Sequence, residues 1–243
     1  MPGQPRRYDG GEPGDAMDQL LLAASLFVGS HFALSSPPLR APLAARLGER
    51  GFTGVYSVLQ IVLLVWLVRA YAAAPVAPVW TPPGWTAWIP ILAMIPALLL
   101  MVGGFVQPNP TAVLQDADGP PDTRPAGIFT ITRHPVMWGF GLWALAHLCA
   151  NGDLASIVLF GAVAVLALAG TLAIDAKKRA RWGNAWGPFA LSTSNLPLRA
   201  IAERRTRLDL AGIGWRTPAI AAVAYLALLG LHPLITGVSA LPH

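Results

Sequence analysis

The sequence predicts an all-α fold, a polytopic transmembrane helix bundle with about six spanning helices. The chain has 243 residues, of which 54% are hydrophobic and only 12% are charged. That is about half the charged share of an average soluble domain. Six apolar stretches are long enough to cross a hydrocarbon core of ~30 Å, which takes ~20 helical residues. Lipid is therefore the expected solvent for most of the surface.

The six expected spans are residues 17–35, 53–73, 86–106, 134–150, 154–174 and 217–237. The stretch 134–150 is the most marginal of them, because it is close to the lower limit of ~17 residues. Only Asn151, Gly152 and Asp153 separate it from the next span. These residue types predict a tight helical hairpin, in which Asn151 and Asp153 form the turn and cap the following helix.

Two segments are expected to lie outside the spans. Residues 1–16 are polar and rich in Gly and Pro, and we expect a disordered N-terminal tail or a true start at Met17, with a single transmembrane domain over 17–243. In the loop between the fifth and sixth spans, Trp182, Trp186 and Phe189 recur at helical spacing over residues 175–191. This pattern predicts an interfacial helix with its aromatic face in the headgroups.

Lys and Arg are distributed unequally between the two sides of these spans. Fourteen of them fall in loops on one side, whereas only Arg6 and Arg7 fall on the other. Because loops rich in Lys and Arg remain in the cytoplasm, we expect basic cytoplasmic loops, both termini outside, and a multi-pass protein of the cell inner (plasma) membrane. Attraction to the lipid bilayer explains the net charge of +5, so nucleic acid is not an expected partner.

Histidines are the chemically informative residues of the spans, because Asp and Glu are absent from all six. Cys149 is the only cysteine, which excludes cysteine-rich metal clusters. Haem needs one or two axial histidines and an apolar slot, which a helix bundle supplies. His134 and His147 are thirteen residues apart on one helix, or ~20 Å, and cannot share an iron. A structural role for each histidine is the other interpretation, and it is preferred for His232.

Four stretches of the sequence resemble the NnrU family: Ser30–Arg40, Thr132–Gly139, Trp143–Asp153 and Asp175–Arg179. That family includes bacterial proteins associated with nitrite and nitric oxide reduction. It is also similar to the plant and cyanobacterial 15-cis-zeta-carotene isomerase, an integral membrane protein that uses haem b. The resemblance extends over nearly the whole chain from Met17 onward and implies that haem b is the cofactor.

The resemblance to the isomerase implies His31 and His147 as the iron ligands, and His134 is the runner-up. The isomerase also has a cysteine one turn before its second ligand. Here that position is Ala144, so an exchange of iron ligands is not expected.

Three further residues are candidates for the cofactor site from their positions. Arg40 and Arg133 border the cytoplasmic side, where guanidinium groups could hold haem propionates, although snorkelling to the interface explains them equally well. Trp143 lies one turn before His147 and could stack on a porphyrin or pack in the core.

Three functions remain open at this point, beside a non-catalytic membrane scaffold in which the histidines only pack. Whether the chain is an enzyme is one of the open questions. The first is a haem protein that supports nitric oxide or nitrite reduction in denitrification, with a nitric oxide reductase under assembly as partner. The second is a carotenoid cis–trans isomerase with a hydrophobic small-molecule substrate. The third is a relative of S-adenosylmethionine-dependent membrane methyltransferases, because Arg133-His134-Pro135 followed by Gly139 resembles their RHPxxxG element.

Overall fold

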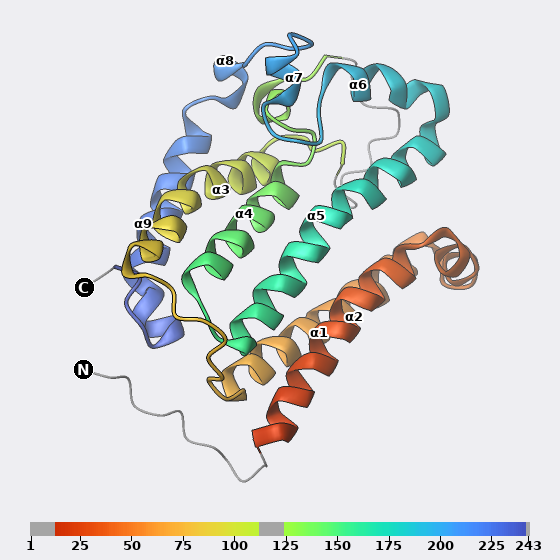
Figure 1. Ribbon diagram of the computed structural model, residues 1–243. Helices are drawn as coiled ribbons and strands as arrows, with labels where there is room; N and C mark the ends of the chain where they lie inside the picture. The colour runs from red at the N-terminus through yellow and green to blue at the C-terminus, as the bar shows by residue number, and fades with distance from the viewer. Residues whose placement is uncertain (1–12, 112–123, 242–243) are drawn as a thin grey trace. The chain divides into compact units, whose positions relative to one another are not determined.

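The computed structural model describes residues 13–111 and 124–241, and every regular element within these ranges is helical (Figure 1). The elements are α1 (Pro13–Ser35), α2 (Pro37–Ala73), η1 (Gly84–Ala87), α3 (Trp88–Val106), η2 (Gly127–Thr130), α4 (Pro135–Ala150), α5 (Leu154–Trp182), η3 (Gly183–Trp186), α6 (Gly187–Ser192), α7 (Arg199–Ala202), α8 (Leu210–Ile213) and α9 (Arg216–Thr236). Within the described ranges, five helices are long and apolar enough to cross a membrane, and α4 is shorter, with 16 residues. The chain is thus an all-α, multi-pass membrane protein. That α4 also crosses the membrane, which would make six spans, remains a prediction.

Helix boundaries differ from the predicted ones at the N-terminal side. Helix α1 begins at Pro13, so residues 13–16 are helical, and the rest of the predicted tail lies outside the described residues. Residues 37–52, expected as a loop, belong to α2, which is kinked at Gly48 with a φ of 72°. Such a positive φ is accessible to glycine at little cost, so the helix can bend there and resume.

The segment 175–191 also differs from the prediction, because it is not a separate helix. Helix α5 continues to Trp182, a 3-10 turn follows, and α6 begins only at Gly187. Trp186 and Phe189 are 1% and 2% exposed, and their rings lie 5.2 Å apart. These two aromatic side chains therefore pack inside the protein and do not form the outward aromatic face expected from their spacing.

The helices fall into two compact units, and the first comprises the chain up to Pro82 together with His147–Leu166. In this unit α1 packs against α2 (Figure 1). The buried residues of α1 recur at intervals of three and four and form a single stripe: Leu20, Ala23, Ala24 and Phe27. A polar contact also joins the two helices, because Gln60 Nε2 donates to Ser30 Oγ at 3.0 Å. Polar side chains inside a membrane bundle are commonly satisfied across helices in this way.

The turn between α4 and α5, also in the first unit, confirms the predicted hairpin. Asp153 caps α5, since its carboxylate accepts from the Ser156 backbone N–H at 3.0 Å and from the Ser156 hydroxyl at 2.6 Å. The Asn151 amide donates to the carbonyl of His147 at 2.8 Å and so caps the end of α4, instead of the following helix. The backbone of Gly152 accepts from the N–H of Val79 at 2.8 Å. Each of the two helix ends therefore has a side chain that pairs with one of its free backbone groups.

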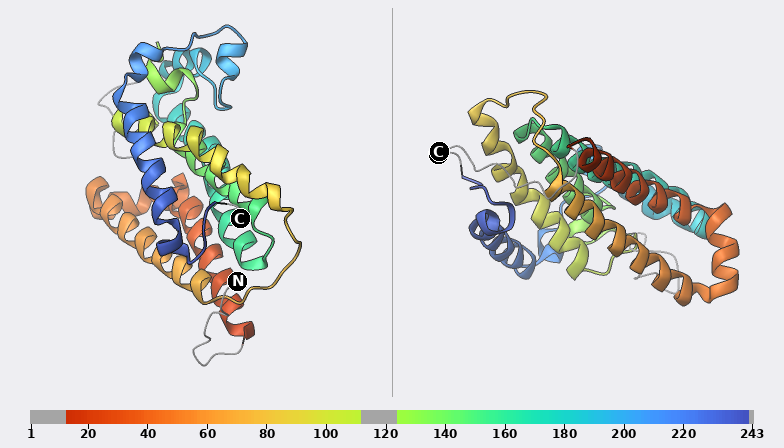
Figure 2. Two further views of the ribbon diagram at one scale, coloured as in Figure 1. Left: turned by 90° about the vertical axis from the view of Figure 1, so that its left-hand side faces the viewer. Right: turned by 90° about the horizontal axis from the view of Figure 1, so that it is seen from below.

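The second unit comprises Pro83–Ala146 and Ala167–His243. Here α9 packs on α3, as the views of Figures 1 and 2 both show, and the Tyr225 hydroxyl donates to the Ile91 carbonyl at 3.2 Å. Helices α3 and α4 approach closely at Gly139, where a Cβ would lie 2.8 Å from the carbonyl oxygen of Ala97. Small residues at such crossings let two helix backbones come together and gain van der Waals contact.

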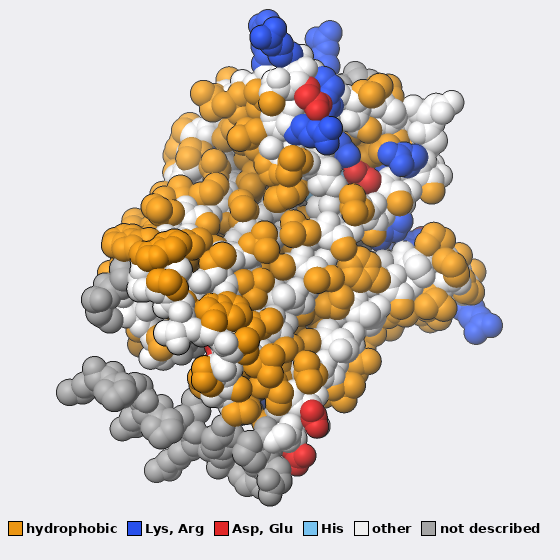
Figure 3. All heavy atoms as spheres, in the orientation of Figure 1, with side chains coloured by type: hydrophobic (Ala, Val, Ile, Leu, Met, Phe, Trp, Pro, Cys, Tyr) orange, Lys and Arg blue, Asp and Glu red, His pale blue; other side chains and the backbone are white. Residues whose placement is uncertain are grey.

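The surface of the second unit separates apolar flanks from one basic end. In Figure 3 hydrophobic side chains cover the helix flanks, and Lys and Arg side chains gather at the end that carries α6, α7 and α8. Exposed apolar side chains of this unit include Leu172 at 66% and Leu226 at 65%. Large apolar areas exposed in this way are expected of helices that have lipid as their solvent.

Candidate functional site

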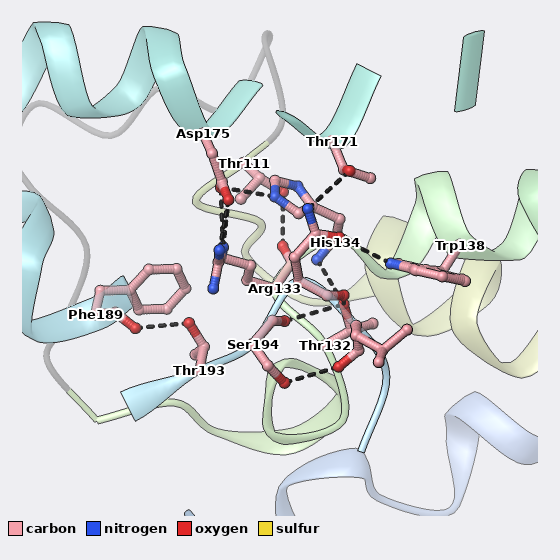
Figure 4. A network of polar contacts seen from close by, with 12 residues as sticks. Thr111, Thr132, Arg133, His134, Trp138, Thr171, Asp175, Phe189, Thr193 and Ser194 are labelled. Atoms are coloured by element: carbon pink, nitrogen blue, oxygen red, sulfur yellow. Dashed lines mark hydrogen bonds and ion pairs between the residues drawn. The ribbon is translucent and has the colours of Figure 1, made fainter. Parts of the chain in front are cut away.

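A buried ionic centre occupies the junction between the start of α4 and the C-terminal part of α5, both in the second unit (Figure 4). Arg133 and His134, directly before α4, point toward Asp175 of α5. Arg133 donates from Nε at 2.9 Å and from Nη2 at 2.5 Å, and His134 Nε2 lies 2.8 Å from Asp175 Oδ1. The side chains of Arg133 and Asp175 are 12% and 11% exposed, and that of His134 is fully buried. The Asp175 carboxylate thus accepts hydrogen bonds from both Arg133 and His134.

Backbone contacts hold this centre in place. The Arg133 N–H donates to the carbonyl of Ser194 at 2.9 Å, and the Thr132 hydroxyl donates to the carbonyl of Asn195 at 2.6 Å. The Thr111 hydroxyl donates to the Arg133 carbonyl at 3.0 Å. Three segments far apart in the sequence therefore meet around Arg133, and their backbone bonds fix where its side chain begins.

One nitrogen of the centre is left without a partner. His134 Nδ1 is buried and makes no hydrogen bond in the described structure. Because the Asp175 carboxylate only accepts, it places the ring proton on His134 Nε2, and Nδ1 then carries the lone pair. Any iron ligation by His134 would have to use Nδ1, since the Nε2–Asp175 bond occupies the other nitrogen. This geometry favours a structural role for His134, and its role as runner-up ligand stays a prediction.

A second carboxylate ties together the loops that surround this centre. Asp209 accepts from the backbone N–H groups of Gly127 at 2.9 Å and of Gly212 at 2.8 Å. These hydrogen bonds, first that from Gly127, hold the pKa of Asp209 below its usual range, because they stabilise the charged form. Asp209 therefore joins η2 to α8 as an anion at neutral pH.

His31 lies in the first unit on α1 and has aromatic surroundings. Its Nδ1 lies 2.8 Å from the carbonyl oxygen of Phe27, one turn earlier, so Nδ1 carries the ring proton and Nε2 the lone pair. The rings of Phe27 and Tyr56 meet the imidazole edge to face, with centroids 4.7 and 5.8 Å away. A tautomer fixed by a backbone carbonyl is what metal-binding histidines usually have.

His147 and Trp143 are the other aromatic candidates on α4. The His147 ring, in the first unit, stacks on Phe160 of α5 with centroids 4.9 Å apart, and is half-buried. Trp143 belongs to the second unit and is half-buried as well. Both side chains thus remain partly accessible, as a cofactor contact would require.

Arg40 and Arg133, the two candidates for contact with haem propionates, are each paired with a carboxylate. Arg40 lies 2.5 Å from Glu49, and its side chain is 38% exposed. Arg133 bonds to Asp175 through two nitrogens, so its charge is already compensated. Among the described residues, no three His, Cys, Asp or Glu side chains are grouped so as to hold a metal ion. A haem iron needs only one or two such ligands.

The model of one protein family, described as NnrU protein, matches residues 19–240, which is nearly the whole chain. The chain belongs to the NnrU family. No curated protein and no solved structure matches it. The predicted resemblance to the NnrU family is therefore confirmed.

Sequence reasoning about this NnrU chain missed the role of Asp175. It gave weight to ionisable groups inside the spans, and Asp175 lies just past the predicted end of the fifth span. A signal was nevertheless present, because a lone acidic residue at the end of an apolar run needs a cationic partner. Arg133, at the start of the preceding helix of the hairpin, is a partner that antiparallel packing brings within reach.

Proposed function

We propose that this NnrU-family protein binds haem b through His31 and His147 and supports nitric oxide or nitrite reduction in the cell inner membrane. The observation that carries the proposal is the hydrogen bond from His31 Nδ1 to the Phe27 carbonyl, which directs the lone pair to Nε2. Phe27 and Tyr56 beside this ring, and Phe160 beside His147, supply the apolar and aromatic contacts that a porphyrin favours.

The residue types around His31 and His147 fit a haem site with two histidine ligands. Neutral imidazoles bind iron, and the Phe27 carbonyl orients the His31 ring. Haem held by two histidines would supply a redox-active iron whose potential such a site can tune for electron transfer. We expect the protein to act beside a nitric oxide reductase, as an assembly factor or a redox sensor.

Two alternatives have less support. Ala144, which stands where the carotene isomerase has its cysteine, is fully buried, and Cys149 is exposed, so the proposal includes no exchange of iron ligands. In the RHP element shared with membrane methyltransferases, Arg133 and His134 bond to Asp175. These bonds favour a structural use of the element over cofactor binding.

The test is the absorption spectrum of detergent-purified protein expressed with a haem precursor. We expect a Soret band in the natural protein and its loss in His31→Ala and in His147→Ala. His232→Ala is the matched control, because that ring bonds to the Val238 carbonyl at the far end of α9 and should leave the band unchanged.

Two results would overturn the proposal. One is a natural protein that elutes as a single folded species and has no Soret band. The other is a band that persists at full intensity in both ligand variants. Equal helix content by circular dichroism in all variants separates loss of haem from loss of fold.

A further inference from the structure

The second unit contains an open cavity of about 590 Å³ at its basic end. Its cationic wall consists of Arg133, Arg199 and Arg205, and its apolar wall includes Trp138, Leu168 and Leu172. Figure 4 labels three of the lining residues, Arg133, Trp138 and Thr171, in the polar network around the ionic centre. No acidic side chain of the described residues lines the cavity. The volume lies in the range of ligand sites, which runs from about 300 to 1,000 Å³.

The three arginines are held in place and leave an excess of positive charge. Arg199 Nε lies 2.7 Å from Glu203, and its side chain is 62% exposed. Arg205 donates to the same carboxylate at 2.7 Å and to backbone carbonyls at the end of α6. Arg133 is compensated by Asp175. Three guanidinium groups thus share two carboxylates, and both carboxylates lie outside the cavity wall.

Part of the cavity lining belongs to the apolar flank of α5. Leu168 and Leu172 are one turn apart on the same face of that helix, and Leu172 is 66% exposed. A molecule in this cavity would therefore meet guanidinium and hydroxyl groups as well as lipid-facing hydrocarbon. That combination fits an amphiphile with an anionic head.

We propose that this cavity binds the phosphate headgroup of an anionic phospholipid, with the acyl chains along the α5 flank at Leu168 and Leu172. Guanidinium groups match phosphate oxygens in geometry and form charge-assisted hydrogen bonds with them. Basic pockets at the cytoplasmic ends of membrane helices recognise anionic lipid headgroups on the same physical grounds. This site involves no histidine and is independent of the proposed haem ligands.

The test counts bound lipids by native mass spectrometry of the full chain in a neutral detergent. The protein is titrated with phosphatidylglycerol and, in parallel, with phosphatidylcholine of the same acyl chains. We expect tighter binding of phosphatidylglycerol, weakened about fivefold in Arg199→Gln, as one Lys or Arg near a membrane surface contributes about 1 kcal/mol. Arg207→Gln removes the same charge from an exposed position outside the cavity wall and should leave the affinity unchanged.

Two further measurements distinguish a lipid site from a structural role of these residues and from a site for soluble phosphate. Glu203→Gln leaves Arg199 and Arg205 uncompensated and should tighten phosphatidylglycerol binding severalfold, which a merely structural role of Glu203 would not do. Inorganic phosphate, added as a competitor, should displace the lipid only at far higher concentration, because it cannot use the apolar wall.

The proposal is overturned if phosphatidylglycerol and phosphatidylcholine bind equally, or if Arg199→Gln and Arg207→Gln weaken binding to the same extent. It is also overturned if inorganic phosphate competes on equal terms, which would assign the site to a soluble phosphate. Arg199→Lys, which keeps the charge, should retain most of the affinity and shows that the Gln variant acts through charge and not through misfolding.

Discussion

Asp175 is the residue on which the ionic centre depends, because both Arg133 and His134 bond to it. A buried ion pair adds little net stability compared with apolar residues of the same volume, but removing one partner leaves the other charge uncompensated. The cost of the loss therefore falls on Arg133, whose side chain is only 12% exposed.

We predict that Asp175→Asn lowers the free energy of unfolding by about 3 kcal/mol, the lower end of the range for breaking a buried pair. Unfolding in mixed micelles with increasing SDS measures this change. Glu203→Gln is the matched control: it makes the same acid-to-amide change in exposed ion pairs, which typically contribute about 1 kcal/mol or less. Equal losses in the two variants would contradict the structural role of the buried centre.

The role of each histidine also depends on the one group to which its ring is hydrogen-bonded. His134 is bonded to a carboxylate, His31 to a carbonyl one turn earlier, and His232 to the carbonyl of Val238 beyond the end of its helix. The sequence presents all three as histidines in or beside apolar helices. Only their partners distinguish a ring that is hydrogen-bonded to a carboxylate from one whose lone pair is directed away from its own backbone.

The packing of α4 on α3 depends on a glycine, which has no side chain. Gly139 faces α3, where a Cβ would lie 2.8 Å from the Ala97 carbonyl and 3.2 Å from the Met101 nitrogen. These are backbone atoms of a helix and cannot move away as a flexible side chain would. The close crossing of α3 and α4 therefore requires glycine at this position.

We predict that Gly139→Ala destabilises the protein by about 1–3 kcal/mol, the usual cost of overpacking. Gly161→Ala on α5 is the control, because its added Cβ would meet no atom within 4 Å. In a helix interior that control should be neutral or stabilising, since Ala has the higher helix propensity. The midpoint of thermal unfolding in detergent checks both variants, and a fall of similar size in the two would be evidence against the crossing described here.

Element boundaries follow local signals only in part. The hairpin between α4 and α5 ends both helices, as its Asn and Asp predict. At the cytoplasmic end predicted for α5, by contrast, no Pro or cap residue stops the helix, and it continues through Asp175 to Trp182. Charged residues after a span mark where the membrane ends, and they do not by themselves end the helix.

For the whole molecule, the number of spans decides on which sides the two termini lie. Helix α4 has 16 residues, which at ~1.5 Å rise is ~24 Å, short of a ~30 Å hydrocarbon core. If α4 and α5 form a spanning hairpin, the termini share one side; if α4 does not span, they lie on opposite sides. The excess of Lys and Arg in the predicted loops favours a shared outer side.

We predict that alkaline phosphatase is active when fused at either terminus and inactive when inserted at Thr206, within the basic segment between α7 and α8. The physical reason is the retention of Lys- and Arg-rich loops in the cytoplasm. Green fluorescent protein at the same three positions is the complementary control, because it reports the inner side. Activity at only one terminus would show that α4 does not span.

The sequence by itself determined that this protein is helical and that lipid surrounds most of its surface. The length of the apolar stretches and the small number of charged residues are sums over many positions, so a wrong interpretation of one residue does not change them. It also identified the family through separated motifs, which the match over residues 19–240 confirms. The α4–α5 hairpin was predictable as well, because turn and cap residues act on their immediate neighbours.

The tertiary structure alone decided which polar groups meet. Asp175 and Arg133 are separated by 42 residues, and no local pattern states their distance or that His134 shares the carboxylate. The same holds for the aromatic side chains of η3 and α6, whose helical spacing suggested a lipid-facing surface although Trp186 and Phe189 are buried. The spacing of residues along a helix determines which side chains share a face. Whether that face is buried depends on the elements that pack against it, and a sequence pattern does not contain that information.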